Sequence, residues 1–135
     1  MKKHLAIFTP SVLDQILNGR KTIESRFSQK RMDPYGKIEV GDIVYCKPTG
    51  GEISAQFRVT KVIYIEGLTK NDLELIRKEY GEKISLGSKE IDDKFFKDKE
   101  TANFGTLIFF DTLEKFIVSP VKIEKRDKRA WVVLE

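Results

Sequence analysis

The sequence predicts an α+β fold: a sheet of five to seven strands that curls into a small mixed β-barrel, with two to three flanking helices. Three observations support this prediction. Strand patterns recur along the whole chain, whereas only two segments show a clear helical pattern. The longest strand pattern changes phase once, as strands do where a β-bulge bends a sheet. The 135 residues include nine Phe, four Tyr and one Trp, which suits a single domain over residues 1–135 with one core.

The first strand and the first helix are predicted close to the N-terminus. Residues 5–8 are apolar on both faces, which is typical of a buried strand. Thr9 can cap the helix that follows, and Pro10 suits its first position, where the missing N–H is not needed. Apolar residues between positions 12 and 17 form one stripe. Gly19 ends the helix, because glycine adopts a left-handed conformation freely.

Residues 22–27 alternate with a period of two and predict a second strand. One face of this strand carries Thr22, Glu24 and Arg26, and the other carries Ile23, Ser25 and Phe27. A polar loop follows over residues 28–37. A Gly-Asp turn at Gly41 and Asp42 then leads into a third strand over residues 43–47.

The second half of the chain predicts a bent strand, a helix and three short strands. Residues 53–65 form the longest strand pattern, with a bulge near Thr60. Thr69 and Asp72 cap a helix that Gly81 ends. Residues 82–105 are charged and irregular, and aromatic side chains are expected to anchor them: Phe95, Phe96 and Phe104. Strands are predicted over residues 106–110, 115–118 and 130–134.

Composition excludes several classes of protein. The single cysteine, Cys46, excludes an intrachain disulfide and with it a disulfide-stabilised secreted domain. His4 and Cys46 alone cannot form a His/Cys zinc site, so we expect neither a metal nor another cofactor. No apolar run approaches the roughly 20 residues of a membrane span, and the N-terminal run is too short for a signal peptide. We therefore expect a soluble cytoplasmic domain without membrane contact.

The charge of the chain is unevenly distributed. The net charge is +4, with +5 in residues 1–31, −3 in residues 32–119 and +3 in residues 120–129. If the fold brings the two basic ends together, they form one basic face, which is the footprint of a phosphate-bearing partner such as RNA. The same lysines and arginines also suit a solvated surface that keeps the protein soluble. The acidic middle segment leaves open a protein partner.

The junction between the first helix and the second strand concentrates polar residues. Gly19 frees the turn, and Lys21 lies where its ammonium group can reach into a cleft. Glu24 stays ionised between cations and holds them in a fixed geometry. With Arg26 and Thr22 beside it, this arrangement suits a phosphate or a polar base edge, and it can also tune a catalytic lysine. An ordinary cross-strand Glu–Arg pair on a solvated face is the structural alternative.

These residues resemble the signature of the ASCH domain family. The pattern Gly-x-Lys-x-x-Glu-x-Arg, just after the first helix, is matched by Gly19, Lys21, Glu24 and Arg26. Residues 40–44 resemble the Gly-Asp strand entry of the family, and residues 57–62 with the helix start at 68–69 resemble its next segment. Residues 125–134 look like the ending of one prokaryotic branch. The resemblance covers most of the chain and is weakest over residues 82–105.

The resemblance implies a β-barrel related to the PUA domain, with the signature lining a cleft proposed to hold RNA or a nucleotide. Lys21, Glu24 and Arg26 then become cleft residues. The complete set of expected ligand-binding residues is Lys21, Thr22, Glu24, Arg26, Arg31, Tyr35, Arg58, Arg126 and Arg129. The last two can contact backbone phosphates or belong to a solvated turn. Trp131 can stack on a base, although a terminal strand residue of this kind is more often part of the core.

The resemblance also implies an alternative, a small hydrolase that acts on a modified nucleoside or on RNA. Some small ASCH proteins hydrolyse the acetyl amide of acetylated cytidine nucleosides with the signature lysine, a threonine three residues later and a distant glutamate. Here Lys21 is present, the threonine position is Glu24, and Glu74 or Glu79 are candidates for the glutamate. Other members cut RNA, for which Lys21 with Glu24 or Tyr35 can act as acid and base. The possible partners are therefore RNA or a nucleotide, a modified nucleoside, and a protein bound through the acidic middle segment.

Overall fold

A six-stranded sheet is the framework of the protein. The computed structural model describes residues 1–123 and 128–134. Within them the elements are β1 (Lys3–Phe8), α1 (Pro10–Leu17), β2 (Ile23–Ser28), β3 (Ile43–Pro48), β4 (Ala55–Glu66), α2 (Lys70–Ile84), α3 (Lys89–Asp98), β5 (Phe104–Lys115) and β6 (Trp131–Leu134). The predicted α+β class is confirmed, and none of these helices is long and apolar enough to span a membrane.

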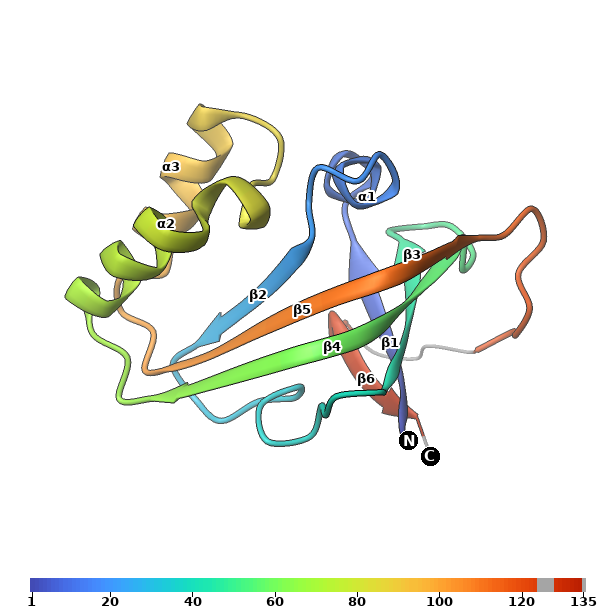
Figure 1. The fold of residues 1–135 in the computed structure, drawn as a ribbon, viewed down its shortest axis with the longest axis horizontal. Helices are drawn as coiled ribbons and strands as arrows, with labels where there is room; N and C mark the ends of the chain where they lie inside the picture. The colour runs from blue at the N-terminus through green and yellow to red at the C-terminus, as the bar shows by residue number, and fades with distance from the viewer. Residues whose placement is uncertain (124–127, 135) are drawn as a thin grey trace.

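The sheet is curled, and its two ends do not pair with each other. The strand order is β2-β5-β4-β3-β1-β6, with β1 parallel to β3 and every other pair antiparallel. The long strands β4 and β5 run side by side through the middle of the molecule (Figure 1). Their register shifts between Val59 and Lys61, which confirms the bulge predicted near Thr60. A bulge increases the local twist, so the sheet bends into a half-barrel with β2 and β6 as its free edges.

The helix boundaries follow local signals at most ends. Pro10 begins α1, and Gly19 takes a φ of 82° just beyond it, both as predicted. Thr9 occupies the N-cap position of α1, but its side chain makes no capping hydrogen bond, so that part of the prediction is wrong. Thr69 and Asp72 form the predicted capping box of α2. The same helix continues past Gly81 to Ile84, because the burial of Ile84 outweighs the modest cost of a helical glycine.

Residues 82–105 contain a helix that the sequence analysis did not predict. Ser88 caps α3 by accepting a hydrogen bond from the backbone N–H of Ile91. Phe96 then packs the helix onto the core, with Phe95 partly buried beside it, so both aromatics serve as the expected anchors. The many charged residues of this segment lie on the solvated side of α3 and hide its helical pattern, which is why the sequence predicted an irregular segment.

The strand predicted over 106–110 is part of a longer strand, β5, and the strand predicted over 115–118 is wrong. β5 runs over Phe104–Lys115, because β4 pairs with it along this whole length and β2 pairs with its first half. Residues 116–118 lie beyond its end, and Ile117 and Val118 are exposed there. The alternation in 115–118 therefore did not indicate a strand of its own.

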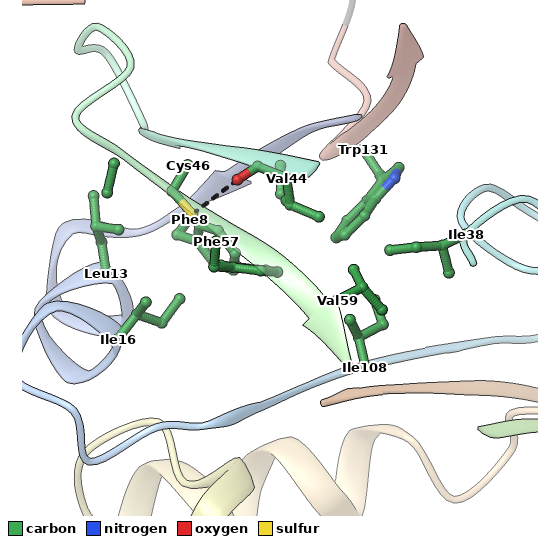
Figure 2. Close-up of a cluster of buried hydrophobic side chains, with 12 residues drawn as sticks. Phe8, Leu13, Ile16, Ile38, Val44, Cys46, Phe57, Val59, Ile108 and Trp131 are labelled. Carbon is green, nitrogen blue, oxygen red and sulfur yellow. Dashed lines mark hydrogen bonds between the residues drawn. The ribbon is translucent and has the colours of Figure 1, made fainter. Parts of the chain in front are cut away.

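Hydrophobic side chains pack on both faces of the sheet. The barrel core fills the concave side beneath α1 and includes Phe8, Phe57 and Trp131 (Figure 2). The helix-side core lies between β2, β5, α2 and α3, and includes Ile23 and Phe27. Both helices cover this side together (Figure 1). Strand β2 thus lies between the two cores: its odd-numbered side chains point to the helix-side core, and its even-numbered side chains point to the barrel core.

Candidate functional site

A cleft lies along β2, between the two free edges of the curled sheet. Its volume is about 680 Å³. One wall comes from the end of β1 and the start of β6, with Phe8 and Trp131, and a second wall comes from residues 24–28 of β2. Residues 32–35 close one end, and Leu86, Phe95 and Lys99 line the side toward α2 and α3. The cleft exists because the barrel does not close between β2 and β6.

Three residues of the signature meet in a chain of charges beside this cleft. The Glu24 carboxylate lies 3.2 Å from Nζ of Lys21 through Oε1 and 2.8 Å from a terminal guanidinium nitrogen of Arg26 through Oε2. A second hydrogen bond runs from Nε of Arg26 to Oε2 at 3.0 Å. Because Glu24 and Arg26 are two residues apart on β2, their side chains emerge on the same face, as the alternation predicted. The structure therefore brings together all three groups.

Lys21 lies beneath the cleft and does not line it. Its side chain is fully buried, and Nζ donates to the backbone carbonyls of Ile23 at 3.0 Å and Ile84 at 2.6 Å. With Glu24 this makes three oxygen partners, one for each proton of an ammonium group. Burial lowers the pKa of Lys21 below its ordinary value, and the charge of Glu24 and the hydrogen bond to it offset part of that shift. The expectation that Lys21 reaches into the cleft is wrong in this arrangement, because its ammonium group already bonds to Glu24 and to two backbone carbonyls inside the protein.

Glu24 is held as a carboxylate. Burial raises its pKa, but the charges and hydrogen bonds of Lys21 and Arg26 outweigh burial and bring the pKa below its ordinary value. Oε1 also accepts a hydrogen bond from the backbone N–H of Ser25 at 3.1 Å. Both carboxylate oxygens are thus occupied by protein groups. In this geometry Glu24 positions its neighbours and offers no free oxygen to abstract a proton.

Arg26 is the cation of the signature that lines the cleft, next to Glu24. Its guanidinium carbon lies 5.0 Å from the ring centroid of Trp131 and 5.4 Å from that of Phe8, within the range of cation–π contact. The side chain keeps 22% of its surface exposed. Glu24 occupies Nε and one terminal nitrogen, and the other terminal nitrogen has no hydrogen-bond partner within residues 1–123 and 128–134. Arg26 thus presents charge and hydrogen-bond donors on an aromatic support.

A second buried network holds Trp131 in place. The Trp131 indole N–H donates to Nδ1 of His4 at 3.1 Å, and Nε2 of His4 lies 2.8 Å from Oδ2 of Asp42. Because Nδ1 accepts a hydrogen bond, the proton of a neutral His4 is on Nε2 and is donated to Asp42. Asp42 also accepts from the backbone N–H groups of Lys2 and Glu39. The Gly-Asp turn therefore has a structural role, which is to orient the aromatic wall of the cleft.

Two further predicted residues line the cleft, and others do not. Tyr35 and Arg129 are in its lining. Arg31 lies next to it and contacts the Tyr35 ring at 5.0 Å without lining the cleft. Thr22 precedes β2, and Arg58 is exposed on the outer face of β4 between the buried Phe57 and Val59, so neither joins the cleft. The prediction for Arg58 is wrong because alternate residues of β4 point to opposite faces, and Arg58 is on the exposed face. Arg126 lies outside the described residues.

Several lining residues were missed by the sequence analysis. Phe95 reaches the cleft from α3, a helix that was not predicted, and Lys99 reaches it from the C-cap of this helix. Phe8 was assigned only to a buried strand, yet it forms part of the wall. No sequence signal linked these positions to the signature, because they approach it only through the tertiary fold. Trp131 is both a core residue, as expected, and a wall of the cleft.

The acidic residues considered for catalysis lie elsewhere. Glu74 lines a separate hollow between α2 and α3, and Glu79 is exposed on α2. Neither lines the cleft. Among the described residues no group of three or more His, Cys, Asp or Glu side chains is placed to hold a metal ion.

Comparison with known proteins finds likeness in structure. No protein-family model matches the chain, and no curated protein matches it in sequence. The crystal structure of ASCH from Zymomonas mobilis is 14% identical, covers 84% of this chain and 70% of its own, and has a TM-score of 0.62. A mutant of the same protein is 13% identical over 100% of this chain and 91% of its own, with a TM-score of 0.71. A protein from Enterococcus faecalis is 12% identical, covers 90% and 87%, and has a TM-score of 0.61.

Sequence identities of 12–14% show that the fold is shared, and they show nothing about function. The agreement in structure extends over the half-barrel and the helices that frame the cleft, since the mutant ASCH protein covers all of this chain. The fold of this chain is therefore that of the ASCH domain.

Proposed function

We propose that this protein binds RNA or a nucleotide in the cleft along β2. The observation that carries the proposal is the position of Arg26, which Glu24 holds against the rings of Phe8 and Trp131 with one terminal nitrogen open to the cleft. A guanidinium group in a fixed orientation binds phosphate oxygens or a base edge well, and its planar face, supported from behind by the buried rings of Phe8 and Trp131, can stack on a base.

The size and the charge of the cleft support the same function. A volume of about 680 Å³ lies within the range of small-ligand sites, which is roughly 300–1,000 Å³. Its lining includes the basic residues Arg26, Lys99 and Arg129 and the acidic residues Glu24 and Asp33. Because Lys21 and Arg26 both pair with Glu24, the signature cluster retains one positive charge beside the cleft. Such a site favours an anionic ligand.

Trp131 provides a direct assay, because it is the only tryptophan in the chain and it lines the cleft. Titration with a single-stranded RNA octamer is expected to change its fluorescence. The affinity is expected to fall as salt rises, with a slope of about 0.7 for each phosphate neutralised. Arg26→Lys keeps a cation beside Glu24 but removes the planar fork, and it is expected to weaken binding about tenfold or more.

Arg20→Ala is the matched control, since Arg20 is an exposed arginine close to the signature that does not line the cleft. It is expected to keep the affinity within about twofold of the unmodified protein. Equal affinities of Arg26→Lys and Arg20→Ala, or no RNA and no nucleotide binding at low salt, would contradict the proposed function.

The hydrolase alternative has less support from the geometry. It requires Lys21 or Glu24 to exchange protons with a substrate, but Lys21 is buried with three oxygen partners and both Glu24 oxygens are occupied. The adaptor alternative depends on the acidic middle segment and stays a prediction. Binding of RNA or a nucleotide is therefore the function that the site supports best.

A further inference from the structure

Strand β2 presents an unpaired backbone edge to the cleft. Among residues 1–123 and 128–134, β2 is the last strand of the sheet and pairs only with β5. The Thr22 carbonyl accepts from Phe110 and the Ser28 carbonyl from Asn103, so the backbone groups of even-numbered residues point toward β5. The N–H and C=O groups of the odd-numbered residues must then point to the free edge. Residues from both faces of β2 line the cleft, which places the cleft along this edge.

The signature side chains close the first part of the free edge. Nζ of Lys21 donates to the carbonyl of Ile23, and Oε1 of Glu24 accepts from the N–H of Ser25. Both contacts agree with the parity of the strand, because both bonded groups belong to odd-numbered residues. Lys21 and Glu24 therefore occupy two of the positions at which another strand would pair with β2.

The next groups along the edge are open. Neither the carbonyl of Ser25 nor the N–H of Phe27 has a hydrogen-bond partner in the part of the chain that the structure describes. The Ser25 side chain adds an independent observation. Ser25 is only 5% exposed and lines the cleft, and its hydroxyl has no hydrogen-bond partner among the described residues. Buried polar groups are normally satisfied, so an unpartnered hydroxyl in the lining of a cleft is a candidate contact for a ligand.

We infer that the cleft takes an unpaired nucleobase, whose pairing edge hydrogen-bonds to the carbonyl of Ser25 and the N–H of Phe27. This inference rests on the proposed function and deepens it. Every base carries a donor beside an acceptor on its pairing edge, which complements an acceptor and a donor on the strand. The Ser25 hydroxyl, which can donate or accept, supplies a third contact.

The walls of the cleft suit a flat ligand in this position. A planar group bonded to a strand edge lies roughly in continuation of the sheet, so its faces turn toward the two sides of β2. Phe8, Trp131 and Arg26 line one side of the cleft. Leu86 and Phe95 line the other. A base would be held between them, and its phosphate can lie near the basic side chains.

The open edge favours a base over a peptide strand. Strand pairing requires a run of free N–H and C=O groups, and the carbonyl of Ile23 and the N–H of Ser25 are already bonded by side chains. The same logic excludes a base-paired ligand, because its pairing edge is occupied by the opposite strand. The site therefore selects single-stranded RNA or a free nucleotide.

The test compares AMP with ribose 5-phosphate, which keeps the sugar and the phosphate but lacks the base. AMP is expected to bind at least tenfold more tightly, because two backbone hydrogen bonds and stacking depend on the base. In a sample with ¹⁵N-labelled phenylalanine, the Phe27 amide proton is expected to move downfield with AMP and with a single-stranded RNA octamer, but not with ribose 5-phosphate. Annealing the octamer to its complement is expected to weaken binding at least tenfold.

A pair of serine variants tests the side-chain contact. Ser25→Ala is expected to weaken AMP binding about three- to tenfold. Ser54→Ala is the matched control, because the Ser54 hydroxyl is also buried without a partner but lies outside the cleft. It is expected to leave AMP binding unchanged. Equal losses in both variants would contradict a contact between Ser25 and the base.

The remaining outcomes separate this inference from the proposed function. Equal affinity for AMP and ribose 5-phosphate, a stationary Phe27 amide, or undiminished duplex binding would overturn the base edge contact and leave a phosphate-binding cleft. A hexapeptide of alternating Thr and Val that moves the Phe27 amide while AMP does not would overturn it in favour of strand pairing. If AMP and the octamer both fail to bind, the proposed function fails as well.

Discussion

The buried ammonium group of Lys21 is expected to be a main determinant of stability. Lys21→Met keeps the length and the apolar stem of the side chain and removes the charge. The substitution leaves the carbonyls of Ile23 and Ile84 without their donor and takes one of its two cations from Glu24. Ile23, Ile84 and Glu24 are all buried, so water cannot replace the lost partner unless the structure rearranges.

The expected loss follows from these contacts. Removing one member of a buried ion pair costs about 3–5 kcal/mol, because the remaining charge stays buried. Glu24 keeps Arg26, which places the charge contribution toward the lower end, but the two stranded carbonyls add to the loss. We therefore expect Lys21→Met to lower the free energy of unfolding by about 3–5 kcal/mol. Since whole domains are stable by only about 5–15 kcal/mol, the effect is large.

Urea unfolding at pH 7, followed by circular dichroism, measures this change. With a slope of about 2 kcal/mol per molar urea, the midpoint is expected to fall by about 2 M. Lys83→Met is the matched control, since Lys83 is exposed in the last turn of α2. It is expected to change stability by less than about 0.5 kcal/mol. A loss below about 1 kcal/mol for Lys21→Met would refute the buried, fully bonded ammonium.

A double variant keeps the test valid if Lys21→Met does not fold. Glu24→Gln removes the carboxylate that Lys21 neutralises, so the combined variant has no unpaired buried carboxylate. The charge that remains in the cluster is that of Arg26, whose side chain is 22% exposed. The loss in the double variant is expected to be at least about 1 kcal/mol smaller than the sum of the single losses. Simple additivity would show that the two groups do not interact.

Three further predictions concern other parts of the molecule. Burial raises the pKa of Asp42, but the hydrogen bonds from His4 and from two backbone N–H groups outweigh burial and bring the pKa below its ordinary value of about 4. The ionised Asp42 therefore stabilises the fold above that pH, and this contribution is lost as the pH falls. Asp42→Asn is expected to make the free energy of unfolding, measured in urea, depend less on pH between pH 2 and 6. Burial raises the pKa of Cys46, so a disulfide reagent is expected to label it at pH 8 only when the protein unfolds, and immediate labelling would contradict its burial. Thr69→Ala is expected to cost about 1 kcal/mol in thermal unfolding through loss of the α2 cap, and an unchanged midpoint would show that the capping box contributes nothing.

Local signals predicted those elements whose boundaries depend on near neighbours. Pro10 and Gly19 bracket α1, the capping box begins α2, and the phase change near Thr60 marks the bulge. These features involve backbone geometry or hydrogen bonds over a few residues, so the residue types alone carry them. The alternation of residues 22–27 belongs to the same group, because opposite faces of a strand follow from its period.

Long-range packing decided the elements that were missed. Helix α3 is stabilised by Phe96 in a core that it shares with β2 and α2, and the extension of β5 to Lys115 depends on its pairing with β4. Gly81 could end α2 on local grounds, but Ile84 extends the helix because its burial is favourable. None of these contributions is visible within a short window of sequence.

The residue order alone groups Lys21, Glu24 and Arg26, because a helix end followed by an alternating strand places them together. How deeply each group is buried depends on the packing of distant segments. Lys21 donates to a carbonyl 63 positions away and is buried, whereas Arg26 faces a hollow whose opposite wall is 105 residues further along the chain at Trp131. Periodicity sets the direction of a side chain, but burial depends on which distant segments pack over it, and that is a property of the whole fold.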